Sequence, residues 1–287
     1  MKISYILVIL AGIFWGTSGI FVRTLTPYGF TPLQITAYRA LFAFILMTIY
    51  VFIKEKSAFK IKLKHLYFFA LSGLALYGAS AAYYSAITLT TVSTAVVVMY
   101  TSPVFVLIMS ILFFKEKLTI LKSVAVGMMV VGCALVSGIV TGFDFNIGGI
   151  LLALVAAISY GSYSIIVKFQ MLRGINALTT TVYSFLFMAI FAVLFANPGE
   201  AILITFRNPQ EILPLTILLG LCTCFLPYFL YTLSLKKLDA GTASALSIIE
   251  PMSACIISIV LKWESLTLYS FIGIVLILVA VLFLSKE

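Results

Sequence analysis

The sequence predicts an all-α polytopic membrane protein with ten transmembrane helices, arranged as two inverted five-helix repeats. Three observations lead to this prediction: the composition, the length of the apolar runs and an internal duplication. Of the 287 residues, 63% are hydrophobic and only 9% are charged, and the mean hydropathy is +1.22. A soluble domain carries roughly a quarter of its residues as charged side chains. Lipid is therefore the solvent that this composition fits.

The apolar runs are too long and too uniform for strands. Because lipid cannot hydrogen-bond the backbone, a spanning segment must be a helix or part of a closed barrel. Barrel strands alternate apolar and polar residues over about ten positions, whereas these runs continue for about 20 residues, enough for a helix to cross ~30 Å. The predicted spans are 4–22, 33–53, 66–87, 93–114, 119–139, 147–167, 177–195, 212–234, 242–261 and 267–284.

The segments between the spans are mostly short. The longest, 196–211, contains Pro198, Gly199, Asn208 and Pro209 and is expected to be a connection with turn chemistry. The first apolar run is too long for the core of a signal peptide and lacks a convincing cleavage site, so it is expected to remain as the first span.

Basic residues orient the predicted spans. Most of the 18 lysines and arginines fall in segments on the same side as the N-terminus, including the lysine-rich run 54–64. The positive-inside rule then places both termini in the cytoplasm of a protein integral to the cell (inner) membrane. This placement explains the net charge of +9 without a nucleic-acid partner. The 54–64 run could also attract anionic lipid, but helix orientation accounts for it.

The cysteines do not suggest a disulfide framework or a metal site. All four lie inside apolar runs, and the two that are closest in sequence would point to different faces of a helix. They are Cys133, Cys222, Cys224 and Cys255. We expect no metal and no cofactor.

The two halves of the chain resemble each other. At one offset Ala11, Gly16, Ile20, Val22, Tyr38 and Phe42 align with Ala156, Gly161, Ile165, Val167, Tyr183 and Phe187. At a slightly longer offset Tyr83, Thr94, Pro103, Glu116 and Thr119 align with Tyr231, Thr242, Pro251, Glu264 and Thr267. The predicted repeats are 1–140 and 145–287. Because five spans per repeat is an odd number, the second repeat must cross the membrane in the opposite sense.

Several segments together resemble a known family. They are FWGTSG, YYSAITLTTVSTAVVVMYTSPVF followed by KEKLT, and YTLSLKKLDAGTASALSIIEPMSA followed by KWESLT. In order, spacing and duplication they resemble the drug/metabolite transporter superfamily, and within it the EamA-type members with two five-helix repeats. The resemblance covers nearly the whole chain. It implies export or exchange of amino acids, drugs or other metabolites through a central cavity, with the fifth and tenth helices at the periphery.

The favoured function is a secondary active transporter that works by alternating access. Its expected partners are a small-molecule substrate, the lipid bilayer and a coupling proton or ion; the oligomeric state stays open. No Walker-type phosphate loop is present, which disfavours ATP-driven transport. With a single histidine there is no H-E-x-x-H motif and no Ser-His-Asp set, so an enzyme is not expected. An intramembrane enzyme, a channel and a scaffold remain the alternatives.

Two charged residues lie inside predicted spans. Glu250 falls near the middle of the ninth span, where it must face a polar cavity, find a partner or be protonated. It could couple protons or recognise a cation, or it could be a structural group bonded to hydroxyls. Arg39 in the second span could bind a substrate carboxylate, pair with Glu250 or extend to the outer interface. Their repeat equivalents are Ser102 and Ser184, so both break the internal symmetry.

Two prolines occupy equivalent positions in the fourth and ninth spans. Pro103 and Pro251 each remove a backbone donor and clash with the carbonyl four residues earlier, at Met99 and Ser247. A kink is expected at each. The kinks could act as hinges, or they could be static bends that shape the packing.

Aromatic residues are the remaining site candidates. Trp15 beside Gly16 and Tyr160 beside Gly161 occupy matched mid-helix positions, which suit a cavity wall with a close helix approach behind it. Further tyrosines lie far from the span ends: Tyr83, Tyr84, Tyr100, Tyr163, Tyr228 and Tyr231. A buried phenol needs a hydrogen-bond partner, so we expect some of them to line a substrate pathway and others only to pack.

Overall fold

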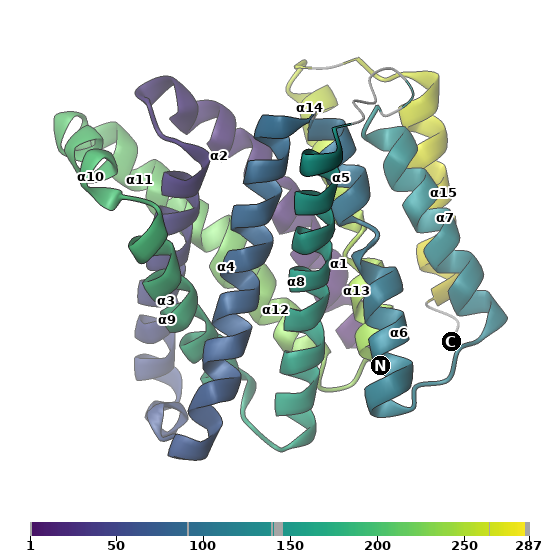
Figure 1. Ribbon diagram of the computed structural model, residues 1–287, viewed down its shortest axis with the longest axis horizontal. Coiled ribbons are helices and arrows are strands. Elements are labelled where there is room, and N and C mark those ends of the chain that lie inside the picture. Colours follow the sequence, from purple (N-terminus) through teal and green to yellow (C-terminus); the bar gives the residue numbers. More distant parts are fainter. Residues whose placement is uncertain (1, 91, 139, 141–145, 264, 285–287) are drawn as a thin grey trace.

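The structure, a computed structural model, describes residues 2–90, 92–138, 140, 146–263 and 265–284. Within these ranges all regular secondary structure is helical. Glu264 and part of the junction between the two predicted repeats lie outside the described residues. The two ends of the described chain lie on the same face, where the Tyr5 hydroxyl donates to the Leu284 carbonyl at 2.9 Å (Figure 1).

The helices of the first half make five crossings, three by one helix each and two by a pair of shorter helices. In chain order they are α1 (Lys2–Gly16) with α2 (Ser18–Leu25), α3 (Pro32–Lys54), α4 (Leu66–Leu89), α5 (Val92–Met99) with α6 (Ser102–Phe114), and α7 (Ile120–Val136). Short 3₁₀ turns η1 (Thr26–Tyr28), η2 (Lys56–Phe59) and η3 (Leu63–His65) connect the first three.

The second half repeats this series. Its helices are α8 (Ile147–Leu172), α9 (Ala177–Phe195), α11 (Pro209–Gly220) continued through the π-helical turn η4 (Leu221–Phe225) into α12 (Leu226–Ser234), α13 (Ala240–Leu246) with α14 (Ile249–Val260), and α15 (Leu268–Leu284). Among the described residues eight of the ten crossings are long and apolar enough to span a membrane alone, and α7 and α15 are shorter apolar helices. The predicted fold class is confirmed.

The outside of the bundle is apolar. Large side chains such as Leu112, Leu194 and Val260 are exposed around its circumference. A soluble protein does not leave so much apolar surface in water, whereas lipid is the solvent that favours it. The chain is a multi-pass membrane protein.

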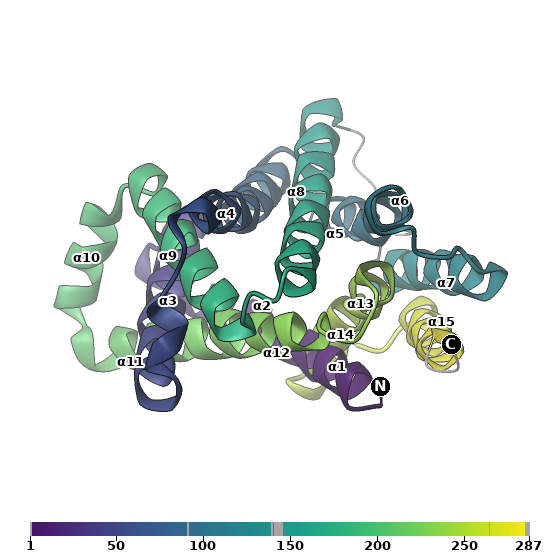
Figure 2. The ribbon, with the colours of Figure 1, turned by 90° about the horizontal axis from the view of Figure 1, so that it is seen from below.

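The two halves interleave rather than fold side by side. In the first half α4 packs on α8 and α9, and in the second α12 packs on α1 while α11 packs on α3. These contacts are images of each other under exchange of the repeats. The pairs α3–α9 and α7–α15 join equivalent helices, and α6–α13 joins the two interrupted crossings. Seen from below, α7 and α15 lie together at one end of the molecule, and α3, α10 and α11 lie at the other (Figure 2).

Small residues set the distances between crossing helices. A Cβ on Gly73 of α4 would collide with Phe187 of α9, and a Cβ on Gly220 of α11 would lie 2.5 Å from Phe42 Cβ of α3. Phe42 and Phe187 are repeat equivalents, so the same contact is made twice. Glycine at such crossings lets backbones approach closely, and this supplies van der Waals packing where lipid removes the hydrophobic driving force.

The connection between α9 and α11 differs from its prediction. Residues Pro198–Arg207 form a helix, α10, in place of the expected turn-rich connection. Pro198 in its first turn and the acidic Glu200 near its N-terminus are helix-start signals. Phe206 is exposed, whereas Thr205 faces the bundle and hydrogen-bonds the Tyr38 hydroxyl at 2.8 Å. This amphipathic helix therefore covers the outer end of α3.

The fourth and ninth crossings are interrupted rather than kinked. α5 ends at Met99 and α6 starts at Ser102, so that Pro103 lies in the first turn of a new helix. Pro251 lies likewise in the first turn of α14. A proline costs least in a first turn, where its missing N–H has no helical acceptor. The two interruptions lie at equivalent positions of the repeats; a hinge motion there stays a prediction.

The contact between α7 and α15 allows a test of packing at glycine. A Cβ on Gly132 would lie 2.8 Å from Ile277 Cγ1 and 2.9 Å from the Gly273 carbonyl, while nothing lies within 4 Å of one on Gly127. We expect Gly132→Leu to lower the free energy of unfolding by about 1–3 kcal/mol through overpacking. Gly127→Leu on the same helix should be neutral. Thermal unfolding in detergent measures both, and equal Tm values for the two variants would contradict the packing argument.

Candidate substrate cavity

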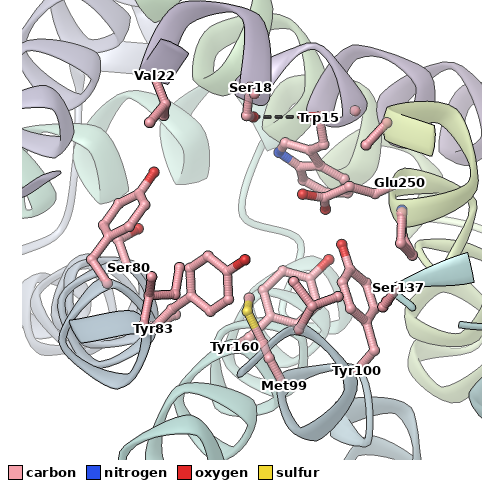
Figure 3. A pocket seen from close by; sticks show the side chains of 18 of the residues that line it. Trp15, Ser18, Val22, Ser80, Tyr83, Met99, Tyr100, Ser137, Tyr160 and Glu250 are labelled. Carbon is pink, nitrogen blue, oxygen red and sulfur yellow. Dashed lines mark hydrogen bonds between the residues drawn. The ribbon is translucent and has the colours of Figure 1, made fainter. Parts of the chain in front are cut away.

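A cavity of about 650 Å³ lies between the two halves. It extends from Trp15 and Glu250 in the middle of the bundle to Arg23, Pro32 and Thr88, at the face away from the termini. Helices of both repeats contribute to its wall. Figure 3 shows the rings of Tyr83, Tyr100 and Tyr160 facing Trp15 and Glu250 across this space (Figure 3).

Glu250 owes its position to the break between α13 and α14. It occupies the first turn of α14, where the helix dipole favours a negative charge. The Tyr100 hydroxyl, from the equivalent break between α5 and α6, serves as its hydrogen-bond donor. The carboxylate therefore sits in the cavity wall at the point where the two interrupted helices meet it.

Two glycines of α1 bring that helix against the backbone of Glu250. A Cβ on Gly16 would lie 2.7 Å from Ser253 Cβ and 3.1 Å from the Glu250 carbonyl, and one on Gly12 would lie 3.3 Å from the Glu250 N–H nitrogen. Gly161, the repeat equivalent of Gly16, similarly approaches α6. Trp15 and Glu250 are thus held on neighbouring helices with little room to separate.

Arg39 lies inside the bundle on α3, not at the membrane interface. Its side chain is buried and donates to the Tyr228 hydroxyl at 3.4 Å, and its guanidinium carbon lies 5.9 Å from the Tyr228 ring centroid. The π-helical turn η4 places Cys224 beside the same guanidinium. The Arg39 Nε has no partner among the described residues. Part of this buried cation is therefore unsatisfied by the protein.

Arg39 and Glu250 both line the cavity, yet they form no ion pair with each other. Among the described residues the ion pairs within 4 Å involve Lys122 with Glu116 and Asp239. One cavity thus presents a cation and an anion, each held by a tyrosine and neither neutralised by the other.

An aromatic cluster forms the floor between these two charges. The Trp15 ring lies 5.0 Å from Tyr228, 6.2 Å from Tyr160 and 5.7 Å from Tyr231 between centroids, mostly in edge-to-face geometry. Such packing is favourable for aromatic pairs and rigidifies the wall. The Trp15 Nε1 is buried without an acceptor among the described residues, which leaves a donor for a ligand.

Below this floor, a buried charge cluster closes the face that carries the termini. Lys122 Nζ on α7 lies 3.7 Å from Glu116 Oε2 and 3.5 Å from Asp239 Oδ2. Glu116 Oε1 also accepts from the Ala240 N–H at 3.0 Å, at the start of α13. The contacts of Glu116 and Lys122 thereby join the connection between α6 and α7 to the connection between α12 and α13. Glu116 joins the two repeats here.

A second set of contacts joins α8 to α12 on the same side. Lys168 Nζ donates to the Leu235 and Leu238 carbonyls at 3.0 and 2.6 Å. Closer to the cavity, the Tyr163 hydroxyl lies 3.2 Å from Thr232 Oγ1, and Ser164 Oγ lies 2.8 Å from the Tyr231 hydroxyl. These bonds leave no described part of the cavity reaching that face.

A sequence profile of the EamA-like transporter family matches residues 2–138 and again residues 147–286. The chain belongs to the EamA-like transporter family. The resemblance seen in the sequence is thus confirmed, and the protein is a transporter of the drug/metabolite transporter superfamily.

Two full-length relatives share this description. The chain is 26% identical to the "Uncharacterized transporter YwfM" of Bacillus subtilis, over 99% of this chain and 94% of the relative. It is 29% identical to an "Uncharacterized transporter" of Clostridium kluyveri, over 97% and 92% of the two chains. A protein crystal structure superimposes with a TM-score of 0.82 at 16% identity, covering 99% of this chain and 96% of that one. This last likeness concerns the fold alone.

The cavity of this EamA-type transporter gathers most of the residues singled out in the sequence. Those that line it are Trp15, Arg39, Tyr83, Tyr84, Tyr100, Tyr160, Tyr228, Glu250 and Pro251. Tyr163 and Tyr231 lie toward the closed face, both fully buried, and Pro103 is next to the lining residue Ser102. Sequence reasoning did not single out Ser80, Met99 or Arg23, which also line the cavity. Only Arg23 carried a signal, because it precedes the first outer connection.

The buried charge cluster yields a stability prediction. Replacing Lys122 with Met leaves the buried Glu116 carboxylate without its cation, and we expect a loss near the lower end of the roughly 3–5 kcal/mol typical of a broken buried pair, since Asp239 is partly exposed. The double variant Lys122→Met/Glu116→Gln should recover part of the loss. Thermal unfolding in detergent reports both, with the exposed Lys117→Met as control. A Lys122→Met protein as stable as the control would refute the assignment.

Proposed function

We propose that this protein is a secondary active transporter that exports or exchanges a small zwitterionic metabolite, an amino acid or a close relative, by alternating access. The observation that carries the proposal is the presence of Arg39 and Glu250 in one cavity without an ion pair between them. A volume of about 650 Å³ lies within the range of small-molecule pockets.

The chemistry of the wall matches such a ligand. The guanidinium of Arg39 can bind a carboxylate by two parallel hydrogen bonds, and Glu250 can accept from an ammonium group. The aromatic rings around Trp15 suit an apolar side chain or the face of a cation. Both charges are expensive to maintain in a low-dielectric bundle, so a ligand that neutralises both would bind with a large electrostatic gain.

Glu250 also suits the coupling step. When no ammonium group is bound, a proton can neutralise the same carboxylate. If a proton and the substrate compete for Glu250, binding of one requires release of the other. Transport of the substrate would then be coupled to movement of a proton in the opposite direction. This is the simplest route by which a proton gradient could drive the substrate, and it requires no cofactor.

The closed face favours a carrier over a channel. The cavity ends at the aromatic floor, and the Lys122 and Lys168 contacts seal the bundle below it. A channel needs a continuous path, whereas a carrier needs one closed face at a time. Transport then depends on a second state in which the other face is sealed.

From the repeat we predict the contacts of that second state. At the offsets of the internal duplication, Tyr163 and Thr232 correspond to Ser18 and Tyr84, and both of these line the open cavity. In the same way Ser164 and Tyr231 correspond to Gly19 and Tyr83. Both hydrogen-bonded pairs of the closed face thus have equivalent positions in the open cavity, of which only Ser18 and Tyr84 both carry hydroxyls.

The same equivalence assigns a role to Arg23. It corresponds to Lys168, whose carbonyl acceptors Leu235 and Leu238 correspond to Ile87 and Thr90. In the present state the Arg23 guanidinium stacks on Trp263 at 4.5 Å. On closure of this face we expect it to cap the carbonyls at the end of α4 instead. With the termini in the cytoplasm, as predicted, the present state faces outward.

Flux measurements test the substrate site. In proteoliposomes, Glu250→Gln and Arg39→Gln should each reduce amino-acid flux about 10- to 100-fold, because a hydrogen bond to a charged group contributes about 1.5–3 kcal/mol. Arg39→Gln should also equalise transport of an amino acid and of the amine that lacks its carboxylate. Lys117→Gln, outside the cavity, is the control. Unchanged flux in both cavity variants would discard the site while family membership would stand.

The state change can be tested without knowledge of the substrate. Lys168→Met removes two hydrogen bonds from the closed face and should move the population toward the opposite state by a factor of about ten or more. Spin labels at Pro27 and Thr88 should then approach each other, while labels at their exposed equivalents Leu172 and Lys236 should separate.

Lys117→Met is again the matched control for these distances. An increase in the Leu172–Lys236 distance without a decrease in the Pro27–Thr88 distance would contradict alternating access. Identical distance distributions in Lys168→Met and the control would contradict the role given to Lys168.

A further inference from the structure

A second hollow, of about 310 Å³, lies at the face that carries the termini. Its wall comes from both repeats: Lys60, Lys62 and His65 from the connection between α3 and α4, and Arg173 and Asn176 from the turn between α8 and α9. It is separate from the central cavity and shares no lining residue with it. Neither the transport cycle nor the closure of the faces uses these side chains.

The hollow has a fixed frame. Thr179 Oγ1 donates to the Ala58 carbonyl at 2.9 Å, and the Tyr183 hydroxyl donates to the Phe59 carbonyl at 2.8 Å. These bonds hold the turn η2 of the first repeat on α9 of the second. The connection that carries Lys60 and Lys62 is therefore held against the second repeat.

The charges in the hollow are unbalanced. Its single carboxylate, Glu55, accepts from Asn176 Nδ2 and from the Ser57 hydroxyl, both at 3.0 Å. Lys60, Lys62 and Arg173 form no ion pair within the described part of the chain. Three cationic side chains thus line the hollow with one carboxylate, which is hydrogen-bonded to Asn176 and Ser57 of the same wall.

Arg173 is positioned before any ligand arrives. Its guanidinium carbon lies 4.7 Å from the Phe68 ring centroid and 4.5 Å from that of Phe169, and Nη1 donates to the Tyr67 hydroxyl at 3.5 Å. The other guanidinium N–H groups have no protein acceptor among the described residues. A fork held by stacking loses little freedom on binding an oxyanion.

Backbone geometry adds to the positive character. Gly174 has a φ of +73°, and nothing lies within 4 Å of a Cβ built on it, so the backbone here is open to the hollow. Asn176 caps α9, whose N-terminus follows directly and carries a partial positive charge.

From this cluster we infer a binding site for a phosphate group, supplied by the headgroup of an anionic lipid or by a soluble phosphate compound. Helix orientation requires only that lysines lie on this side of the membrane. It does not require an arginine stacked on aromatic rings, a hydrogen-bonded carboxylate and a hollow lined by both repeats. The site lies where the ends of α3 and α8 reach the membrane surface, the level at which lipid phosphates are found.

Binding to detergent-purified full-length protein tests the inference. Dioctanoyl phosphatidylglycerol and inorganic phosphate are titrated separately, with dioctanoyl phosphatidylcholine as the zwitterionic comparison, and binding is followed by native mass spectrometry and by thermal stability. We expect wild type to prefer phosphatidylglycerol over phosphatidylcholine. Arg173→Gln and Lys60→Gln/Lys62→Gln should each weaken that binding at least about tenfold.

The control is Lys236→Gln/Lys237→Gln, which removes two exposed lysines from the same face outside the hollow. It should bind as wild type does. Binding of inorganic phosphate with the same variant pattern, without a preference for the anionic lipid, would assign the site to soluble phosphates. Equal losses in the control and the hollow variants, or no phosphate-dependent binding by wild type, would overturn the inference.

Discussion

The bilayer offers no hydrogen-bond partners, and this constraint decides where every polar side chain of the bundle lies. Most find a partner on a neighbouring helix: Ser72 with Ser184 at 2.6 Å, Tyr163 with Thr232, and Ser164 with Tyr231. Some have no partner in the described part of the chain. The Nε1 of Trp15, the Nε of Arg39 and the Tyr160 hydroxyl belong to residues that line the cavity, whereas the Ser110, Thr180 and Ser244 hydroxyls lie elsewhere in the bundle. The cavity thus holds part of the polar groups that the packing leaves incomplete.

Symmetry and asymmetry serve different parts of the molecule. The residues Tyr163, Tyr231 and Lys168 that help to close one face have equivalents at the other face in the internal duplication, whereas the Lys122 cluster does not. The charged groups of the cavity have no charged equivalents, because Arg39 corresponds to Ser184 and Glu250 to Ser102. Ser184 is satisfied by Ser72 within the packing, whereas Arg39 is not fully satisfied. The duplicated helices could therefore alternate between two related states. The site between them is asymmetric, with a cation and an acid at different positions, so it could distinguish the two ends of a ligand.

The sequence was sufficient for the spans, their duplication and their inversion, because lipid imposes length and composition on every crossing. It was insufficient for departures from regular helix. The break between α1 and α2 at Thr17 and the π-helical turn at Leu221–Phe225 are not predicted by the sequence pattern, and α10 lies in a segment whose proline and glycine also suit a turn. Nor could spacing separate Tyr160, which lines the cavity, from Tyr163, which does not. They are three residues apart on nearly the same face of α8, so only depth, about 4.5 Å along the axis, distinguishes them.

The two faces have different means of closing. On the face with the termini, Lys122 joins Glu116 and Asp239, and Lys168 caps two carbonyls. At the other face Ser270 stands where the repeat would place Lys122, and it bonds locally to Thr267. By the same offsets Arg23 corresponds to Lys168 and Glu264 to Glu116, but no cation takes the place of Lys122. We therefore expect the state that is open at the face away from the termini to be the more stable one. For the proposed exporter the unfavourable step would be opening of the face closed by Lys122 and Lys168, through which the substrate enters the cavity. Protonation of Glu250 from the open side would make that step easier, because the empty cavity could then close without an unpaired carboxylate inside it.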